Sequence, residues 1–273
     1  IFYAERDTTL YERHSEQNTG MDEILELTKI ASGSRENGVI QADTSNTRFL
    51  IDFGSEITTI SQSIVDGKIP ALNNGHIASA SVFLNIKASE ANDLLFSYSI
   101  KAFPVSQSWS NGLGKFDDVP KTKVGSSWLN RSGDAVAQSG IAWDTGSAHS
   151  YHTGIGTLVT DGGGTWITGS GYEASQSFQN EAPDIRMNVT DIVDKWITSN
   201  ITNNGFIVKR PHSDEISGDI LGSIKYFGRE SHTIFVPKLE VVFDDSSGQP
   251  ANPISSNTYV PYFKNIKAEY RTS

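Results

Sequence analysis

Residues 188–208 constrain the fold of this chain most, because they carry its one convincing helical pattern. Four apolar residues repeat at intervals that place them on one face of a helix: Ile192, Val193, Trp196 and Ile197. The short side-chain oxygen of Thr190 or Asp191 would cap the start of this helix by accepting from free N–H groups of the first turn. The Asn-Asn-Gly sequence at 203–205 ends it, and an apolar strand follows at 206–208. We therefore expect a short helix that buries Trp196 in the core and closes one end of a β-structure.

Elsewhere the chain alternates apolar and polar residues over short segments, which is the pattern of half-buried β-strands. Alternate residues from Phe49 to Phe53 share one face of such a strand. Residues 78–88 and 94–103 alternate in the same way, and the short turn between them predicts a long antiparallel hairpin. The same reasoning predicts further strands at residues 2–4, 8–11, 24–27, 205–209, 223–227 and 234–243.

Three segments interrupt this pattern. Residues 32–45 are polar and predict a loop, and residues 60–75 predict a connection that contains one helical turn. Residues 109–180 are the least regular part of the chain and hold much of its glycine. They predict a long loop-rich insertion with short strands at 158–159 and 166–167, and loops of this length in a compact domain usually have a function.

These elements together predict an all-β fold, a jelly-roll-like β-sandwich with one short packed α-helix and a long loop-rich insertion. We assign the sandwich to residues 1–245. Residues 246–273 begin with a polar stretch that holds Pro250 and Pro253. This stretch predicts a linker, followed by the start of a second small domain or by a tail that docks on a partner.

Composition narrows the possible functions. The net charge of −10 argues against nonspecific binding to nucleic acid or to an anionic membrane, because both need a basic surface. No run approaches the roughly 20 apolar residues of a membrane helix. Cysteine is absent, which excludes disulfides and thiolate metal sites and favours folding in a reducing compartment.

Catalytic motifs are also missing. The sequence contains no Gly-x-Ser-x-Gly, no His-Glu-x-x-His and no phosphate-binding Gly-x-x-x-x-Gly-Lys-Ser/Thr. Its 32 acidic residues leave many carboxylate pairs open for glycoside cleavage, but nothing in the sequence selects one pair. We therefore predict no catalytic residue and interpret the chain as a protein that is not an enzyme.

The aromatic residues of the insertion are the candidates for ligand or partner binding: Trp109, Trp128, Trp143, Tyr151 and Trp166. Sugars stack on exposed tryptophan faces, and protein interfaces are enriched in the same residue. The third interpretation is that these rings pack the interior of a large insertion. The sequence leaves all three open.

Metal sites are weakly indicated. His149 and His152 place two imidazoles three residues apart, but a glycine-rich loop more often leaves such side chains solvated. Asp117 and Asp118 could supply oxygen ligands for a structural calcium ion, with solvated turn carboxylates as the alternative. No Asp-x-Asp-x-Asp-Gly loop occurs, so the prediction is that the protein needs no metal and no cofactor.

Three charged residues have mainly structural interpretations. Arg229 and Glu230 are adjacent, and an arginine fork of this kind most often ties strand ends together through fixed contacts. Asp191 fits a helix cap or a partner of a buried arginine. The alternative for each of them is a role in ligand binding.

Four blocks of sequence resemble a known family when they are taken in order. Residues 48–53 resemble an R-x-L-I-x-F-D strand, and residues 106–110 resemble an S-x-S-W turn. Residues 188–209 resemble a V-T-D-x-V-x-x-W … N-x-G-x-x-L-K segment, and residues 225–241 resemble an F-x-S-R-E … P-x-L-x-V ending. Together they are similar to the disaggregatase-related (DNRLRE-type) β-sandwich modules, some of which bind carbohydrate.

This resemblance covers residues 8–244. The long insertion, and the end of the chain soon after residue 270, are more similar to the version of this sandwich in structural proteins of tailed, marine T4-like bacteriophages. The resemblance implies a non-catalytic structural protein of a virion, as a tail, neck, baseplate or fibre component. Its partners would be copies of itself and other virion proteins. The alternative is a carbohydrate-binding module of a secreted, extracellular bacterial protein, with polysaccharide as its ligand.

Overall fold

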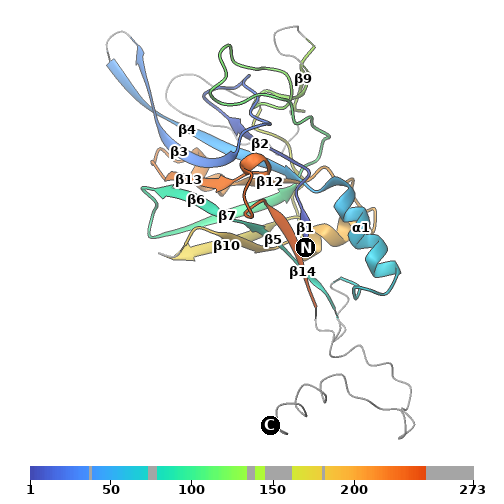
Figure 1. Ribbon diagram of the computed structural model, residues 1–273. Helices are drawn as coiled ribbons and strands as arrows, with labels where there is room; N and C mark the ends of the chain where they lie inside the picture. The colour runs from blue at the N-terminus through green and yellow to red at the C-terminus, as the bar shows by residue number, and fades with distance from the viewer. Residues whose placement is uncertain (37–38, 73–78, 134–138, 145–161, 180–181, 244–273) are drawn as a thin grey trace, which may run out of the picture. The chain divides into compact units, whose positions relative to one another are not determined.

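The structure is a computed structural model that describes residues 1–36, 39–72, 79–133, 139–144, 162–179 and 182–243 (Figure 1). Between residues 32 and 43 it describes the backbone alone. The chain divides into two compact units, residues 1–243 and residues 244–273, and every described residue belongs to the first unit.

Curled antiparallel sheets dominate the described residues, so the predicted all-β sandwich is confirmed. The smaller sheet has the strand order β1 (Phe2–Tyr3), β14 (Lys238–Val242), β5 (Ser81–Ile86) and β11 (Ile185–Asn188). The larger sheet has the order β10 (Ala174–Gln179), β7 (Ser97–Pro104), β12 (Phe206–Lys209), β4 (Val39–Asp52), β3 (Ile24–Glu36), β13 (Gly222–Phe227) and β6 (Ala88–Asn92). β2 (Arg6–Tyr11) also pairs with β4, beside this path. The strands predicted at residues 205–209, 223–227 and 234–243 correspond to β12, β13 and β14.

The long strand β4 organises the larger sheet. Its first half pairs with β3, and its second half pairs with β2 on one side and with β12 on the other. The loop predicted at residues 32–45 is therefore wrong, because this segment forms the β3–β4 hairpin. Backbone groups make the ladder of a hairpin, so a run of Ser, Thr and Asn can form it without the apolar residues on which the prediction relied.

The hairpin predicted from residues 78–88 and 94–103 is also wrong. β5 pairs with β11 and β14, whereas β7 pairs with β10 and β12 in the other sheet. Between them, β6 pairs with β13 in the larger sheet. Both β5 and β7 bury alternate residues, and two strands that face one core from opposite sheets have the same pattern as two paired strands.

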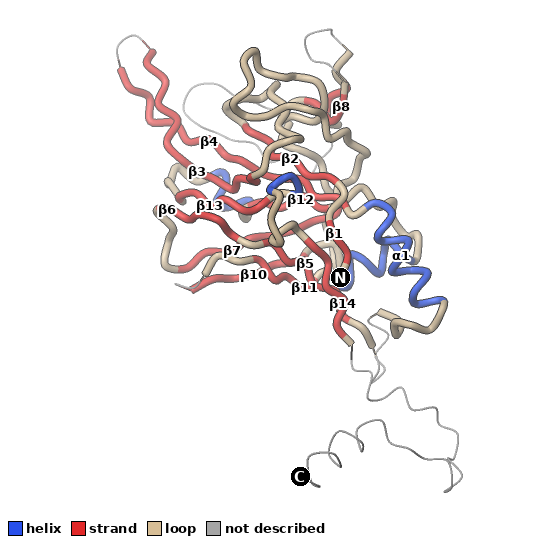
Figure 2. The backbone as a smooth tube through the Cα atoms, viewed as in Figure 1, coloured by secondary structure: helices blue, strands red, loops and turns tan. Residues whose placement is uncertain are grey.

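The described residues contain three α-helices and one 3-10 turn, and not the single predicted helix. They are α1 (Gly54–Val65), α2 (Thr190–Ile197), α3 (His212–Ile216) and η1 (Arg229–Ser231). Figure 2 shows α1 beside the edges of the sheets at one end of the sandwich. The helical turn predicted within residues 60–75 is the second half of α1, and the first half was missed because only Ile57 and Ile60 are buried in a run that is otherwise rich in Ser and Thr.

Helix α2 is the predicted one, but its start differs from the prediction. Thr190 is already helical, Val189 holds the capping position, and that residue makes no side-chain capping bond. The Asn188 Oδ1 atom instead accepts from the backbone N–H and the hydroxyl of Thr190, at 3.0 and 2.6 Å. Trp196 lies in the main core at 5% exposure, with its ring edge against Phe206.

The larger sheet is buried on both faces. Phe49 and Ile51 of β4 belong to the main core between the two sheets, together with Phe206 and Val208 of β12. The intervening residues of the same strands belong to a second core on the outer face. This second core consists of Leu10, Leu50, Phe103, Val105, Trp109, Trp128, Trp143, Trp166 and Ile207.

The insertion covers this outer face, and Figure 2 shows its loops beside β2 and β8. Among its described residues it has one small two-stranded sheet, β8 (Asn130–Ser132) with β9 (Ile141–Ala142). Trp166 forms an isolated bridge with Val105. The strand predicted at 158–159 lies outside the described residues. β10 belongs to the main fold, so the insertion ends before Ala174 and is shorter than predicted.

Candidate functional site

The four tryptophans predicted to bind a ligand or partner are all buried. Trp109, Trp128, Trp143 and Trp166 are 3%, 4%, 2% and 8% exposed. The indole N–H groups of Trp109 and Trp143 donate to the backbone oxygens of Asn204 and Ser127, at 2.8 and 2.9 Å. Of the three interpretations left open, their burial favours packing of the interior of the insertion, because the four rings belong to the second core on the outer face of the sheet.

Tyr151, the fifth aromatic candidate, lies outside the described residues, as do His149 and His152.

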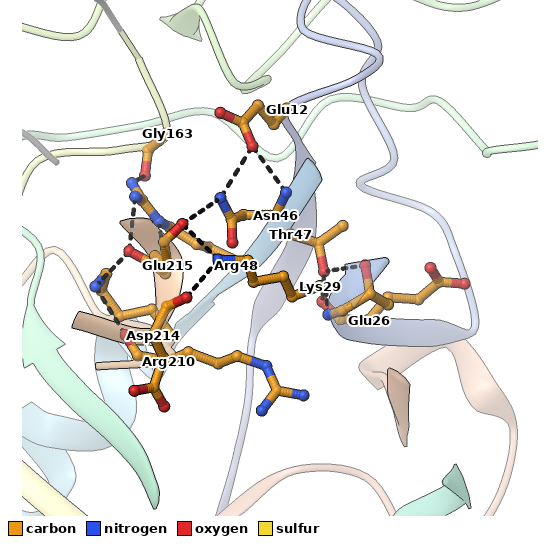
Figure 3. A network of polar contacts seen from close by, with 12 residues as sticks. Glu12, Glu26, Lys29, Asn46, Thr47, Arg48, Gly163, Arg210, Asp214 and Glu215 are labelled. Atoms are coloured by element: carbon orange, nitrogen blue, oxygen red, sulfur yellow. Dashed lines mark hydrogen bonds and ion pairs between the residues drawn. The ribbon is translucent and has the colours of Figure 1, made fainter. Parts of the chain in front are cut away.

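Beneath the tryptophans lies a buried ionic cluster that the sequence reasoning missed. Glu215 of α3 receives Arg48 of β4 through two hydrogen bonds, from Nε at 2.9 Å and from Nη2 at 3.0 Å. Lys209 of β12 approaches the same carboxylate at 2.7 Å. All three residues are about as buried as the aromatic core around them, at 2% exposure each. Figure 3 shows the Arg48 and Glu215 side chains directed toward each other.

The tryptophan rings and one loop complete the surroundings of Arg48. Its guanidinium lies over the rings of Trp128 and Trp166, at 4.7 and 5.2 Å from their centroids. Its Nη1 atom donates to the backbone oxygen of Gly163 at 2.7 Å. A Cβ atom on Gly163 would lie 2.4 Å from that nitrogen, and its φ of +77° is left-handed, so only glycine fits this close approach.

Two further cations lie at the same place. Lys29 of β3 donates to the backbone oxygens of Asp214 and Ser217, and to that of Glu215 at 2.9 Å. Arg210 donates to the backbone oxygen of Leu221 at 2.9 Å. Two cations, Arg48 and Lys209, therefore meet the buried Glu215 carboxylate itself, whereas Lys29 and Arg210 are buried nearby and donate to backbone oxygens.

The charges of this cluster depend on one another. Burial by itself would raise the pKa of the Glu215 carboxyl, but Arg48 and Lys209 outweigh it and hold that pKa below its usual value. Burial lowers the pKa of Lys209 to about 8, although Glu215 opposes the change. No member of this trio is exposed enough to meet a substrate, so we interpret the cluster as a structural tie between α3, β4 and the insertion.

An open groove lies on the larger sheet, beside Tyr11 of β2 and Glu26 of β3. The rings of Tyr11, His14 and Phe116 form a cluster, with Phe116 4.9 Å from Tyr11 and 5.4 Å from His14 between centroids. Two cavities of about 320 and 200 Å³ share Tyr11, Glu26 and Phe116 as lining residues. The sequence analysis did not select any of these rings, because none of them belongs to a motif.

Several carboxyls line or adjoin this groove. Burial raises the pKa of Asp22 to about 6, against a hydrogen bond from the Phe116 N–H at 3.0 Å. Burial also raises the pKa of Glu26, against the attraction of Lys225. Behind the groove, burial raises the pKa of Asp7 to about 7, and Asp7 accepts from the backbone N–H of Arg229 at 2.6 Å.

The other predicted polar residues make local contacts. Asp118 accepts from the Lys115 N–H at 2.8 Å and from the Thr122 hydroxyl at 3.0 Å, and Asp117 lines the larger cavity. In the part of the chain that the structure describes, no group of three or more His, Asp or Glu side chains is placed to hold a metal ion.

Arg229 and Glu230 pair with each other in η1. Asp191 lies exposed in the first turn of α2. No helix within the described ranges is long and apolar enough to cross a membrane.

Comparisons with known proteins leave the family open. No protein-family model matches this sequence, and a search of curated proteins gave no match. The resemblance of the four sequence blocks to a phage sandwich module therefore stays a prediction.

Proposed function

We propose that this chain is a non-catalytic structural module of a bacteriophage virion, which acts by packing against copies of itself and against other virion proteins. One observation carries the proposal, a set of large apolar side chains exposed along β1 and next to the two ends of β14. β1 pairs with Lys238 and Leu239 of β14, and β14 pairs with β5 on its other side.

These side chains lie on or beside β1, on the segment before β14, where Phe235 stacks on Phe227 at 5.3 Å between centroids, and at the end of β14. We call them the edge patch: Ile1, Tyr3, Ile234, Phe235, Val242 and Phe243. Ile234 is the most exposed of them at 83%. Apolar and aromatic residues in such a position are typical of the centre of a protein interface, so the edge patch supports a role in assembly.

The buried tryptophans weigh against the alternative, a secreted extracellular module that binds polysaccharide. That alternative relied on exposed rings, and the four described rings lie inside the second core. The assignment to a virion relies on the sequence resemblance, whereas the edge patch supports docking in general. We therefore expect self-association and no retention of the protein by polysaccharide gels.

The test is the oligomeric state of the full chain, measured by sedimentation and light scattering. We expect a concentration-dependent dimer or closed ring, and a shift to monomer in the double variant Ile234→Lys, Val242→Lys. Val65→Lys is the matched control, because Val65 is also apolar and 77% exposed but lies on α1. A wild-type protein that stays monomeric, or a double variant that associates like the control, would contradict the proposal. Retention of a monomer on a polysaccharide gel would favour the alternative.

A further inference from the structure

The groove around Phe116 combines two kinds of wall. The smaller cavity has an apolar side, made by Tyr11, Ile30, Phe116 and the ring of His14, and Arg13 and Glu26 are its charged lining residues. The larger cavity is acidic and is lined by Asp22, Glu23, Glu26 and Asp117, with Lys115 as its one basic lining residue. Because the rings of Tyr11 and Phe116 line both cavities, an occupant of the groove would touch apolar and acidic surface at once.

The cations beside the acidic side are engaged elsewhere. Lys225 lies opposite Glu26 in the β3–β13 ladder and attracts its charge, but it pairs with Glu90 at 2.9 Å, and Lys121 lies over the Phe116 ring, 4.9 Å from its centroid. Lys115 pairs with Glu23, at 3.5 Å. Within the described ranges, no cation forms an ion pair with Asp22, Glu26 or Asp117. Burial raises the pKa values of Asp22 and Glu26 even though Lys115 and Lys225 oppose the change, so the nearby cations compensate these partly buried carboxylates only in part.

A second, independent feature points to a hydrogen-bond donor in the same groove. Asn46 lines the smaller cavity and is 3% exposed. Its Nδ2 group donates to Glu12 at 3.0 Å and to the backbone oxygen of Glu215 at 3.3 Å. Its Oδ1 atom is buried and receives no hydrogen bond from the described residues. A buried acceptor of this kind normally has a donor, so a ligand N–H would complete it.

A contact elsewhere in this domain shows which kind of side chain can bind an aromatic ring and a carboxylate together. The guanidinium of Arg6 lies 4.4 Å from the centroid of the Trp109 ring and pairs with Asp52 at 2.7 Å. An arginine or lysine side chain can thus lay its apolar stem and cationic head on a ring while a carboxylate binds its charge. A neutral sugar would stack on the rings but would leave the carboxylates uncompensated.

From these contacts we infer that the groove between Tyr11, Phe116, Glu26 and Asn46 binds a basic segment of a partner protein. An arginine or lysine enters the acidic cavity, and a neighbouring apolar side chain enters the smaller one. The inference rests on the proposed docking function and gives it a second contact surface, distinct in its residues from the edge patch.

The experiment is a titration of the full isotope-labelled chain with acetyl-leucyl-arginine amide, followed through backbone amide NMR signals. The matched probe is acetyl-leucyl-citrulline amide, which keeps the shape of arginine without its charge. We expect signals of Asp22, Glu26, Asn46 and Phe116 to shift with the arginine probe. We expect affinity for the citrulline probe to be weaker by about tenfold or more, as for the loss of a partly buried charge contact.

Two variants locate the site. Glu26→Gln keeps the side-chain shape and should weaken binding of the arginine probe by about tenfold. Glu173→Gln is the control, because Glu173 is exposed and pairs with Lys101 outside the groove. Equal binding of the two probes, equal loss in the two variants, or no shift at the groove would overturn the inference.

Shifts at the groove with a glucan hexasaccharide and none with the arginine probe would overturn the inference in favour of a glycan site. The outcome is separable from the proposed function. A chain that still self-associates through its edge patch while its groove stays empty rejects this inference alone. A monomer whose groove binds the arginine probe rejects the edge-patch assembly and keeps the groove.

Discussion

Two carboxyl groups are almost fully buried on opposite faces of the β2–β4 ladder, and their surroundings move their pKa values in opposite directions. Glu215 is 2% exposed and lies on the insertion side, where Arg48 is paired in register with Leu10 of the second core. Asp7 is 1% exposed and lies opposite Ile51, which belongs to the main core. Directly opposed residues of a ladder share a face, so the two acids are buried by different halves of the molecule.

The difference lies in their partners. Glu215 meets two cations, Arg48 and Lys209, which in turn lie over the rings of Trp128 and Trp166. Its pKa is lowered despite its burial. Asp7 forms no ion pair within the described residues and relies on one backbone N–H, and burial raises its pKa to about 7. Burial alone therefore does not decide whether a carboxylate stabilises or destabilises the fold at neutral pH. The number of opposite charges buried with the carboxylate decides this.

The largest expected effect comes from breaking the Glu215 cluster. Glu215→Ala leaves Arg48 and Lys209 buried without their carboxylate, so we expect a loss of unfolding free energy toward the upper end of roughly 3–5 kcal/mol. Glu16→Ala is the matched control, because Glu16 pairs with Lys123 at the surface and should cost less than about 1 kcal/mol. Urea unfolding at neutral pH measures both. A loss no larger than that of the control would mean that backbone oxygens and rings alone compensate the cations.

The next largest expected effect is the dependence of the unfolding free energy on pH that Asp7 causes. The folded-state pKa of Asp7, about 7, lies above its usual value of 3.8, so the folded protein keeps a proton that the unfolded chain releases between these values. The contribution of Asp7 to stability is therefore complete below pH 3.8 and is lost as the pH rises through 7. At about 1.4 kcal/mol per pH unit the loss is on the order of 4 kcal/mol.

Asp7→Asn should remove this dependence. The Asn side chain keeps an acceptor for the Arg229 N–H but cannot ionise, so the variant should be more stable than the wild type at pH 8 and lose that advantage near pH 4. Asp144→Asn, at an exposed position, serves as the control and should leave the slope unchanged. Urea unfolding between pH 4 and 8 measures the three proteins. Parallel curves for wild type and Asp7→Asn would show that Asp7 titrates normally.

Neither buried acid was predicted from the sequence, and the reason shows which features of the fold a sequence pattern can predict. Strand alternation and helical spacing predict which residues face the main core, and Phe49 and Ile51 of β4 and Trp196 of α2 lie there as their spacing indicates. Alternation does not predict strand partners, because β5 and β7 face one core from two sheets with the same pattern. Pairing is decided by long-range contacts, which no local pattern encodes.

The ionic cluster left a signal that the sequence analysis did not use. Lys209 lies two residues after Ile207, and Arg48 lies two residues before Leu50. Each charged residue is therefore expected on the same face of its strand as a residue of the second core. A charged residue that continues the buried phase of a strand predicts a buried partner. The partner itself was not predictable, because Glu215 lies in a five-residue helix without periodicity. The tryptophans were left undecided for a related reason, since tryptophan fits both a binding surface and a core.

The smallest expected effect concerns the contact that Asp7 makes with Arg229, because this contact is what distinguishes Asp7 from Glu215. Arg229 binds Asp7 through its backbone N–H, whereas its guanidinium pairs with Glu230 in the same turn. Arg229→Gln should therefore change the unfolding free energy by less than about 1 kcal/mol. Glu230 raises the pKa of Asp7 and the Arg229 charge lowers it, so Glu230→Gln should lower that pKa and Arg229→Gln should raise it slightly. Carboxyl NMR titration of Asp7 measures both changes. Shifts in the same direction would mean that the turn moves as a whole when its ion pair is broken, and that the backbone contact depends on that pair.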